Sequence, residues 1–301
     1  MTLPFSYVLN VVAAGHEADD VAAELRATLA RTGGAGEIEW LSPDKAFDIA
    51  FESNPHVALN EARAVAATLP IDINVVAADN RRKKLLIADM DSTIIDVECL
   101  DELADMAGLK PVIAEITERA MRGELVFEDA LRERVAMLKG LELAALDRVY
   151  QERIRLNPGA KTLLATMRAH GAHTLLVSGG FRFFTSRVAQ AAGFHGDQAN
   201  DLLHEGGLLT GKVAEPILGR EAKLAALENA AAELRIDAAD ALAVGDGAND
   251  LAMIQRAGLG VAYHAKPIVA QAAGASVSHG DLTALLYLQG YRDEEFVSPA
   301  T

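Results

Sequence analysis

Four short, continuous apolar runs constrain the fold of this chain more than any other feature. Long helical segments separate them, and small or polar residues follow each run at once. Strands that are buried on both faces and separated by helices are typical of a parallel sheet covered by helices on both sides. The sequence therefore predicts an α/β fold with a doubly wound parallel sheet. The runs are Leu85–Ala88, Thr174–Val177, Ala241–Val244 and Leu259–Ala262.

The first two runs are separated by about eighty residues, far more than one crossover helix needs. Helical spacing recurs between them, at Ile113–Met121, Phe127–Leu138 and Leu143–Ile154. The simplest arrangement is a helical cap inserted after the first strand, at about residues 100–156.

The first eighty residues have the texture of a small α+β unit. Their order is roughly β-α-β-β-α-β, which is the ferredoxin-like pattern. We therefore expect one domain over residues 1–80 and a second over 81–301, with the basic run Arg81–Lys84 as a solvated boundary. The predicted strands are Tyr7–Val12, Ala46–Phe51 and Ile71–Ala77, the predicted helices are Asp19–Ala30 and Val57–Leu69, and a turn is expected at Gly33–Gly36.

Charge and composition exclude several classes of function. Of the 301 residues half are hydrophobic, so the chain is not predominantly disordered, and its formal charge of −15 disfavours nucleic acid or a membrane surface as a partner. No apolar run is long enough to span a bilayer, and Leu3–Ala14 lacks the cationic start of a signal peptide. Cys99, the single cysteine, fits a reducing compartment. We expect a cytoplasmic protein.

Polar clusters follow three of the predicted strands. These clusters should meet in one crevice, because ligands of open α/β sheets bind outside the carboxyl ends of the strands. Asp89, Asp91 and Asp246 would repel one another there unless a cation joined them, and oxygen ligands without His or Cys favour Mg²⁺. The clusters are Asp89-Met90-Asp91-Ser92-Thr93, Ser178-Gly179-Gly180 and Gly245-Asp246-Gly247-Ala248-Asn249-Asp250.

This chemistry suits phosphoryl transfer with Asp89 as the nucleophile, because a carboxylate is already ionised and Ser178 has no evident base. Asp91 would then protonate the leaving oxygen and deprotonate the attacking water. We expect Ser92 and Thr93 to cap the following turn. The hydroxyl of Ser178 and free N–H groups of Gly179 and Gly180 would balance the phosphate charge. Lys223 is either the required cation or a surface lysine on the first turn of a helix over Glu221–Leu234.

The three clusters together with Lys223 resemble the four motifs of the haloacid dehalogenase superfamily. Within it, the stretch from Leu85 to about Gly274 is most similar to the phosphoserine phosphatase family. More specific marks are Asp91-Ser92-Thr93-Ile94-Ile95 followed by Glu98, the cap stretch Ala120–Leu125 with Phe127-Glu128 and Leu131–Val135, and Tyr263-His264-Ala265-Lys266-Pro267. The first eighty residues are similar to the small ACT-like modules fused to some longer members.

The resemblance implies hydrolysis of O-phospho-L-serine, the last step of serine biosynthesis, through an aspartyl phosphate on Asp89. Mg²⁺ would be held by the Asp89 carboxylate, the Asp91 main-chain carbonyl and Asp246, with Gly180 and Asp250 in support. Glu98 would accept from the substrate ammonium and Arg134 would grip its carboxylate. Arg132 lies on another face of the same helix. The residues expected at the phosphate or substrate are Ser178, Gly179, Lys223 and Asn249.

Other functions remain open at this point. The nearest is a phosphatase or phosphotransferase of the same superfamily for another small phosphorylated metabolite. A phosphate-responsive binding module would leave Asp91 and the cap without a purpose, and a nucleotide-sugar glycosyltransferase would not explain Ser178-Gly179-Gly180. The expected partner is a small phosphorylated substrate, and a homodimer is compatible with the sequence.

Overall fold

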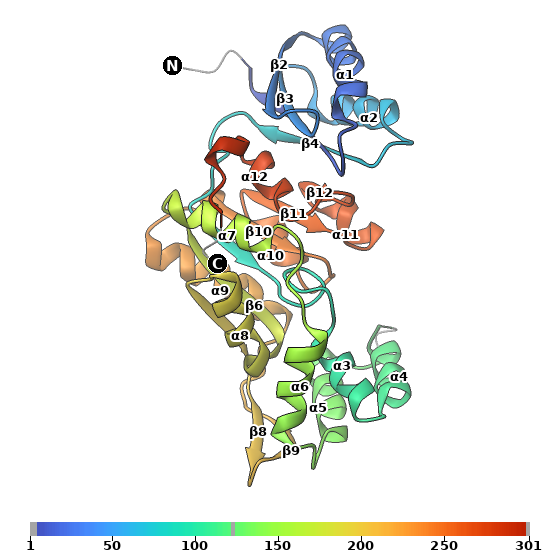
Figure 1. Ribbon diagram of the computed structural model, residues 1–301, viewed down its shortest axis with the longest axis vertical. Coiled ribbons are helices and arrows are strands. Elements are labelled where there is room, and N and C mark those ends of the chain that lie inside the picture. The colour runs from blue at the N-terminus through green and yellow to red at the C-terminus, as the bar shows by residue number, and fades with distance from the viewer. Residues whose placement is uncertain (1–4, 122–123, 299–301) are drawn as a thin grey trace.

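The computed structural model describes residues 5–121 and 124–298. Three layers follow one another along its long axis (Figure 1). A small α+β unit lies at one end, a parallel sheet with its helices lies in the middle, and a group of helices with a β-hairpin lies at the other end.

The central sheet confirms the predicted doubly wound fold. Its strand order is β12-β11-β10-β5-β6-β7, and every neighbouring pair is parallel. Leu86 and Ala88 of β5 face one apolar cluster, whereas Leu85 and Ile87 face another on the opposite side. The four apolar runs are all strands, and two short edge strands without such runs extend the sheet. The six strands are β5 (Leu85–Ala88), β6 (His173–Phe181), β7 (Gly196–Asn200), β10 (Ala241–Gly245), β11 (Leu259–Tyr263) and β12 (Ala275–Val277).

Helices cover both faces of this sheet. On one side the cluster around Leu86 includes Leu163 and Phe184, and on the other side the cluster around Leu85 includes Leu227 and Met253. The helices concerned are α7 (Ala160–Ala169), α8 (Arg182–Ala192), α9 (Arg220–Leu234) and α10 (Leu251–Arg256), and α11 (Pro267–Ala272) and α12 (Ala284–Leu288) follow β11 and β12 in the chain.

The N-terminal unit has the β-α-β-β-α-β order that its sequence pattern predicts. Its antiparallel sheet has the order β2-β3-β1-β4, and Leu9, Leu25 and Phe47 lie in the core between this sheet and its two helices. The second strand begins inside the expected glycine-rich turn, at Ala35. The elements are β1 (Tyr7–Ala13), α1 (Ala18–Thr32), β2 (Ala35–Ser42), β3 (Ala46–Phe51), α2 (Pro55–Val65) and β4 (Ile71–Ala77).

A row of buried polar residues covers the other face of this small sheet. Asn10 on β1 lies in register with Asp48 on β3 and with Asn74 on β4. Side chains alternate between the faces of a strand, so these three point away from the core that Leu9 and Phe47 share. They meet the C-terminal part of the chain, because Asn10 donates to the carbonyl of Tyr287 and Asn74 pairs with both backbone groups of Ser276.

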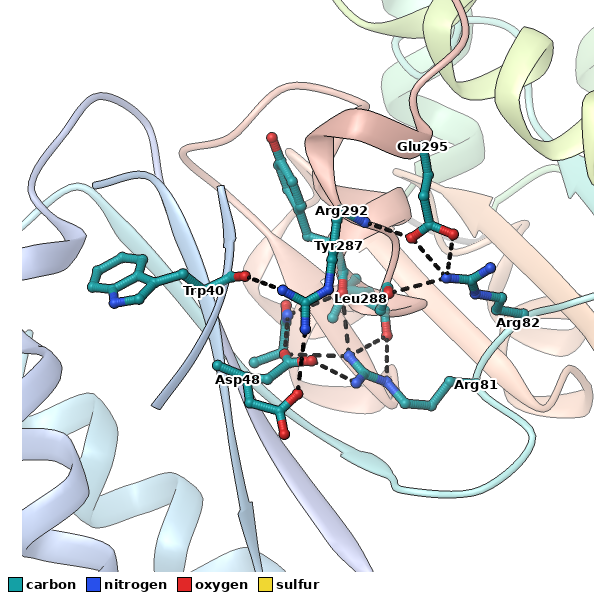
Figure 2. Close-up of polar contacts among 11 residues, drawn as sticks. Trp40, Asp48, Arg81, Arg82, Tyr287, Leu288, Arg292 and Glu295 are labelled. Atoms are coloured by element: carbon teal, nitrogen blue, oxygen red, sulfur yellow. Dashed lines mark hydrogen bonds and ion pairs between the residues drawn. The ribbon is translucent and has the colours of Figure 1, made fainter. Parts of the chain in front are cut away.

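Arg81 joins the two units (Figure 2). Its guanidinium forms an ion pair with Asp48 at 2.6 Å and also donates to the carbonyls of Tyr287 and Leu288. The expectation of a solvated boundary is therefore wrong for Arg81 and for the buried Lys83, whereas Arg82 and Lys84 are exposed as expected. Only 14% of the Arg81 side chain and 8% of the Asp48 side chain are exposed, since the basic run finds its acidic partner on the neighbouring unit.

Two further contacts connect the units at their strand edges. The Asp72 carboxylate accepts hydrogen bonds from the backbone N–H groups of Ser278, His279 and Gly280. Arg292, near the C-terminus, donates to the carbonyl of Trp40 (Figure 2).

The predicted cap is helical, and a hairpin that the sequence pattern did not reveal packs against it. Gly140 donates to the carbonyl of Leu209, and Leu209 donates to the carbonyl of Leu141. The hairpin follows β7, so the chain leaves the sheet twice to build this layer. The elements are α3 (Cys99–Met106), α4 (Lys110–Met121), α5 (Phe127–Met137), α6 (Leu143–Arg153), β8 (Leu202–Glu205) and β9 (Leu208–Val213).

We predict that Asp48→Ala destabilises the protein by about 3–5 kcal/mol, because it leaves the Arg81 guanidinium buried without its counter-charge. Urea unfolding measures this change. The matched control is Arg26→Ala, which removes an ion pair with Glu37 whose side chains are 40% and 86% exposed, and which should cost about 1 kcal/mol or less. Equal losses in the two variants would contradict the role assigned to the Arg81–Asp48 pair.

Candidate active site

The three polar clusters meet at the carboxyl edge of the central sheet. Asp89 follows β5, Ser178 lies on β6 and Asp246 follows β10, and these three strands are neighbours. The chain enters the sheet at β5 and continues on both sides of it, so this edge is the topological switch point, where α/β sheets bind ligands. The Asp89 N–H donates to the carbonyl of Val244, which fixes the two strand ends to each other.

Lys223 is buried between two of the carboxylates. Its ammonium lies 2.6 Å from Asp89 and 2.6 Å from Asp250, and only 2% of the residue is exposed. Burial alone would lower the pKa of Lys223, but the two carboxylates outweigh burial and raise it. The expectation of a surface lysine is excluded, and Lys223 stays charged.

The same carboxylates belong to a cluster that could hold a metal ion. Oxygen atoms of Asp89, Asp246 and Asp250 all lie within 4.8 Å of one another. Burial and then the charge of Asp250 raise the pKa of Asp89, despite Lys223, and raise the pKa of Asp246 to about 6. Three carboxylates share one ammonium, and their oxygen donors are those that hard divalent cations bind. The residues present therefore fit the divalent cation that the sequence implies.

Small residues are required around this cluster. A Cβ atom at Gly245 would collide with the carboxylate of Asp250, and one at Gly247 would collide with the side chain of Asn249. The N–H of Gly247 also donates to Asp250 at 3.0 Å. The glycines therefore allow the loop after β10 to turn back onto its own carboxylates.

Asp91 is held by neutral donors. One carboxylate oxygen accepts from the Cys99 N–H at 2.9 Å, and the other accepts from the Ser178 hydroxyl at 3.1 Å. Burial raises the pKa of Asp91. Its carboxylate lies outside the group formed by Asp89, Asp246 and Asp250, and a raised pKa is the property that a proton carrier needs.

The loop after β5 differs from the sequence expectation. Instead of capping the following turn as expected, the Ser92 hydroxyl donates to Glu98 at 2.8 Å, and the Thr93 hydroxyl approaches Asp246 at 3.5 Å. Both residues lie within the turn itself, and the next helix begins only at Cys99. Both hydroxyls therefore contact site residues, a role that their types alone did not indicate.

The Ser178-Gly179-Gly180 segment continues β6 rather than ending it. The N–H of Gly180 donates to the Ser178 hydroxyl at 2.8 Å, so it is not free as expected. The segment folds back on its own serine, which in turn donates to Asp91. On the cap side Phe127 covers Gly179, since a Cβ atom there would lie 3.1 Å from the ring.

Glu98 and Arg134 supply opposite charges on the cap side of the site. Loss of water around the carboxylate and then the charge of Asp91 raise the pKa of Glu98 to about 7, although the residue as a whole is exposed. Burial lowers the pKa of the half-buried Arg134, against the opposing charges of Asp101 and Glu98. Arg132, by contrast, is exposed and pairs with Asp129 and Glu215. Of the two arginines, Arg134 is thus the one within electrostatic reach of Glu98.

The other residues that the family motifs singled out lie near this site, elsewhere in the fold, or outside the described residues. Asn249 is exposed on the loop between Gly247 and α10. His264 follows β11 and lies 3.0 Å from the carbonyl of Gly280, a structural contact. Arg122 and Gly123 of the cap stretch fall outside the described residues. None of the helices within 5–121 and 124–298 has the length and apolar character needed to cross a membrane.

Comparisons with known proteins agree with this geometry. Residues 86–255 match the family of haloacid dehalogenase-like hydrolases. Phosphoserine phosphatase from Polaromonas sp. is 46% identical over 223 residues, which cover 72% of this chain and 94% of that protein.

Two solved structures are also similar. A HAD family hydrolase from Salmonella enterica subsp. enterica serovar Typhi is 28% identical with a TM-score of 0.83, covering 94% of this chain and 98% of that one. A phospho-aspartyl intermediate analogue of phosphoserine phosphatase is 37% identical with a TM-score of 0.63, covering 68% of this chain and 98% of that one. With its four motifs gathered at one sheet edge, the chain belongs to the family of haloacid dehalogenase-like hydrolases.

Proposed function

We propose that this enzyme hydrolyses O-phospho-L-serine to L-serine and phosphate. The observation that carries the proposal is a pair of opposite charges: Glu98 at the start of α3, within electrostatic range of Asp91, and Arg134 on the cap helix α5, within electrostatic range of Glu98. An amino acid presents one ammonium and one carboxylate, and these two side chains complement both. The names of the similar phosphatases support the same substrate.

Asp89 is the nucleophile in this proposal. Its carboxylate attacks phosphorus, the bond to the serine oxygen breaks, and Asp91 gives that oxygen its proton. Water then attacks the phosphorus of the aspartyl phosphate and loses a proton to Asp91, the bond between phosphorus and the Asp89 oxygen breaks, and phosphate leaves with both carboxyl groups restored. Lys223 fixes one oxygen of Asp89 at 2.6 Å, so the nucleophile is oriented before substrate arrives.

The phosphate oxygens are met by neutral and cationic donors from other segments. Ser178 and Gly179 approach from β6, Lys223 approaches from the first turn of α9, and Asn249 approaches from the loop after β10. Gly180 supports them by donating to the Ser178 hydroxyl, and Asp250 supports them by pairing with Lys223.

The cation is Mg²⁺ in this proposal. Asp89 and Asp246 would hold it with their carboxylates and Asp91 with its main-chain carbonyl. Bound there, Mg²⁺ would supply charge stabilisation to the transferring phosphoryl group. Ca²⁺ has a larger and looser coordination shell and should support activity poorly.

The chain is divided into two domains in this proposal. Residues 1–80 form an ACT-like domain, and residues 81–301 form the phosphatase domain, with the cap at about 100–156. The free, buried Cys99 and the biosynthetic substrate fit an enzyme that acts in the cytoplasm.

We predict that Asp89→Asn lowers the turnover of O-phosphoserine by roughly a thousandfold or more, because the amide keeps the shape but loses the nucleophilic charge. Steady-state phosphate release measures turnover, and acid quenching should trap an acyl phosphate in the wild type only. Asp105→Asn on α3 is the control for loss of a carboxylate elsewhere. Turnover of Asp89→Asn near the wild-type rate would exclude the covalent route.

We predict that Mg²⁺ stabilises the protein and that chelator removes activity. At a hundred times its dissociation constant Mg²⁺ should raise the free energy of unfolding by about 2.7 kcal/mol, measured in urea, and Asp246→Asn should reduce this gain. Full activity in chelator would contradict the cation site.

The same site gives a pH dependence in chelator. The pKa of Asp246 is raised from 3.8 to about 6, so the folded protein holds the proton on this carboxyl more tightly than the unfolded chain does. The stabilisation that results is complete below pH 3.8 and is lost as the pH rises through about 6. Metal-free wild type should therefore lose stability across this range relative to Asp246→Asn.

We predict that Arg134→Ala lowers kcat/KM for O-phosphoserine by roughly tenfold to a hundredfold, the value of a charge-assisted contact of about 1.5–3 kcal/mol. An aryl phosphate has no carboxylate, so its hydrolysis should change little and reports on folding. Arg132→Ala, two residues away on the exposed face of α5, is the matched control and should leave both substrates unchanged. If Arg134→Ala impairs both esters equally, Arg134 supports the cap, and a different phosphorylated metabolite becomes the better candidate.

A further inference from the structure

Asn200 is a buried side chain that the proposed mechanism does not use. It is the last residue of the edge strand β7, in register with Phe181 of β6, and only 2% of it is exposed. Its side-chain amide contacts backbone groups of two separate segments, those of Gly179 and Leu218.

The first contact reaches the proton carrier through a short chain of hydrogen bonds. The Asn200 amide N–H₂ donates to the Gly179 carbonyl at 2.9 Å. That carbonyl and the Gly180 N–H belong to one planar peptide, so fixing one fixes the direction of the other. The Gly180 N–H donates to the Ser178 hydroxyl at 2.8 Å, and this hydroxyl donates to Asp91 at 3.1 Å.

The second contact fixes the segment that leads into α9, the helix that carries Lys223. The Leu218 N–H donates to the Asn200 carbonyl oxygen at 2.7 Å, and the Asn200 amide donates back to the Leu218 carbonyl at 3.2 Å. Gly219 follows as the N-cap residue of α9, so Lys223 lies within the first turns of the helix that this clamp fixes. One side chain therefore ties the β6 segment to the start of α9.

The peptide between Gly179 and Gly180 has no side chain on either flank to restrict its rotation. Gly179 cannot carry a Cβ atom without pressing on Phe127 at 3.1 Å, and a Cβ at Gly180 would lie 3.1 Å from Asp91. Since glycine peptides rotate more freely than others, hydrogen bonds orient this one, with Ser178 from within the segment and with Asn200 from outside it. Asn200 donates to it from a buried position.

We propose that Asn200 is a positioning residue for the leaving-group proton: it orients the Gly179–Gly180 peptide, and through Ser178 it aims Asp91 at the ester oxygen. This inference rests on the proposed function, in which Asp91 is the acid. Removing Asn200 should therefore harm substrates in proportion to their need for an acid.

The test compares alkyl and aryl phosphate esters in Asn200→Ala. An alkoxide must be protonated as it leaves, whereas nitrophenolate leaves without help, and kcat/KM covers the steps up to departure of the alcohol. We expect kcat/KM for O-phosphoserine to fall by roughly tenfold to a hundredfold more than kcat/KM for p-nitrophenyl phosphate. This difference is part of the rate acceleration that a general acid supplies. Asn200→Ser, which retains a small polar side chain, is the second variant if the alanine protein does not fold.

Asn74→Ala is the matched control. Asn74 is 1% exposed and clamps both backbone groups of Ser276 in the same way, at the contact between the N-terminal sheet and the edge strand β12. It should lower the thermal midpoint of unfolding as Asn200→Ala does but leave the ratio of the two esters at its wild-type value. Equal losses on both esters in the Asn200 variants, or the same change of ratio in Asn74→Ala, would overturn the proposal.

The wild type separates this inference from the proposed function. If it hydrolyses p-nitrophenyl phosphate and alkyl monoesters other than O-phosphoserine, but not O-phosphoserine itself, the proposed substrate is wrong. The Asn200 comparison then proceeds with the alkyl ester that the enzyme does turn over, and the expected ratio is the same.

Discussion

A single buried ammonium holds the catalytic edge of this protein together. Lys223 comes from α9, Asp89 from the end of β5 and Asp250 from the start of α10, and the two contacts of 2.6 Å join these three elements at one point. Two carboxylates buried this deeply repel each other and have lost their hydration, and a counter-charge is needed to offset both costs. The lysine therefore allows the sheet edge to concentrate negative charge, and the remaining excess makes the cluster attractive to a divalent cation.

The two aspartates of the Asp89-Met90-Asp91 segment differ in what surrounds them. The Lys223 ammonium contacts Asp89 and favours its ionised form, against the burial that raises its pKa, whereas a backbone N–H and a hydroxyl hold Asp91. Neutral donors orient a carboxyl group without adding a positive charge beside it, so Asp91 is better suited to take up and release a proton. Residues of one type, two positions apart, thus gain separate roles from their partners.

The sequence predicts the features that depend on local pattern. Strands such as Leu85–Ala88 are buried on both faces, so a continuous apolar run reveals them, and the polar residues after them mark the site. The edge strands β7 and β12 are short, and β7 (Gly196–Asn200) is largely polar, so no apolar run marks them.

Other features depend on partners that are distant in the chain. Periodicity could not place Lys223, because α9 carries alanines around most of its circumference. Arg81 lies 33 residues from Asp48, so only the packed units show that the basic run is an internal contact.

The polar row on the N-terminal sheet limits how this unit could be exchanged in evolution. Asn10 and Asn74 hydrogen-bond to Tyr287 and Ser276, Asp48 accepts from Asn10 and Arg81, and Val12 lies in the same apolar cluster as Tyr287. Loss of the first unit would expose that cluster and leave Arg81 without its acid. A gene fusion or domain exchange at this junction can therefore succeed only if both surfaces change together, so the two halves of the chain are bound to evolve as one.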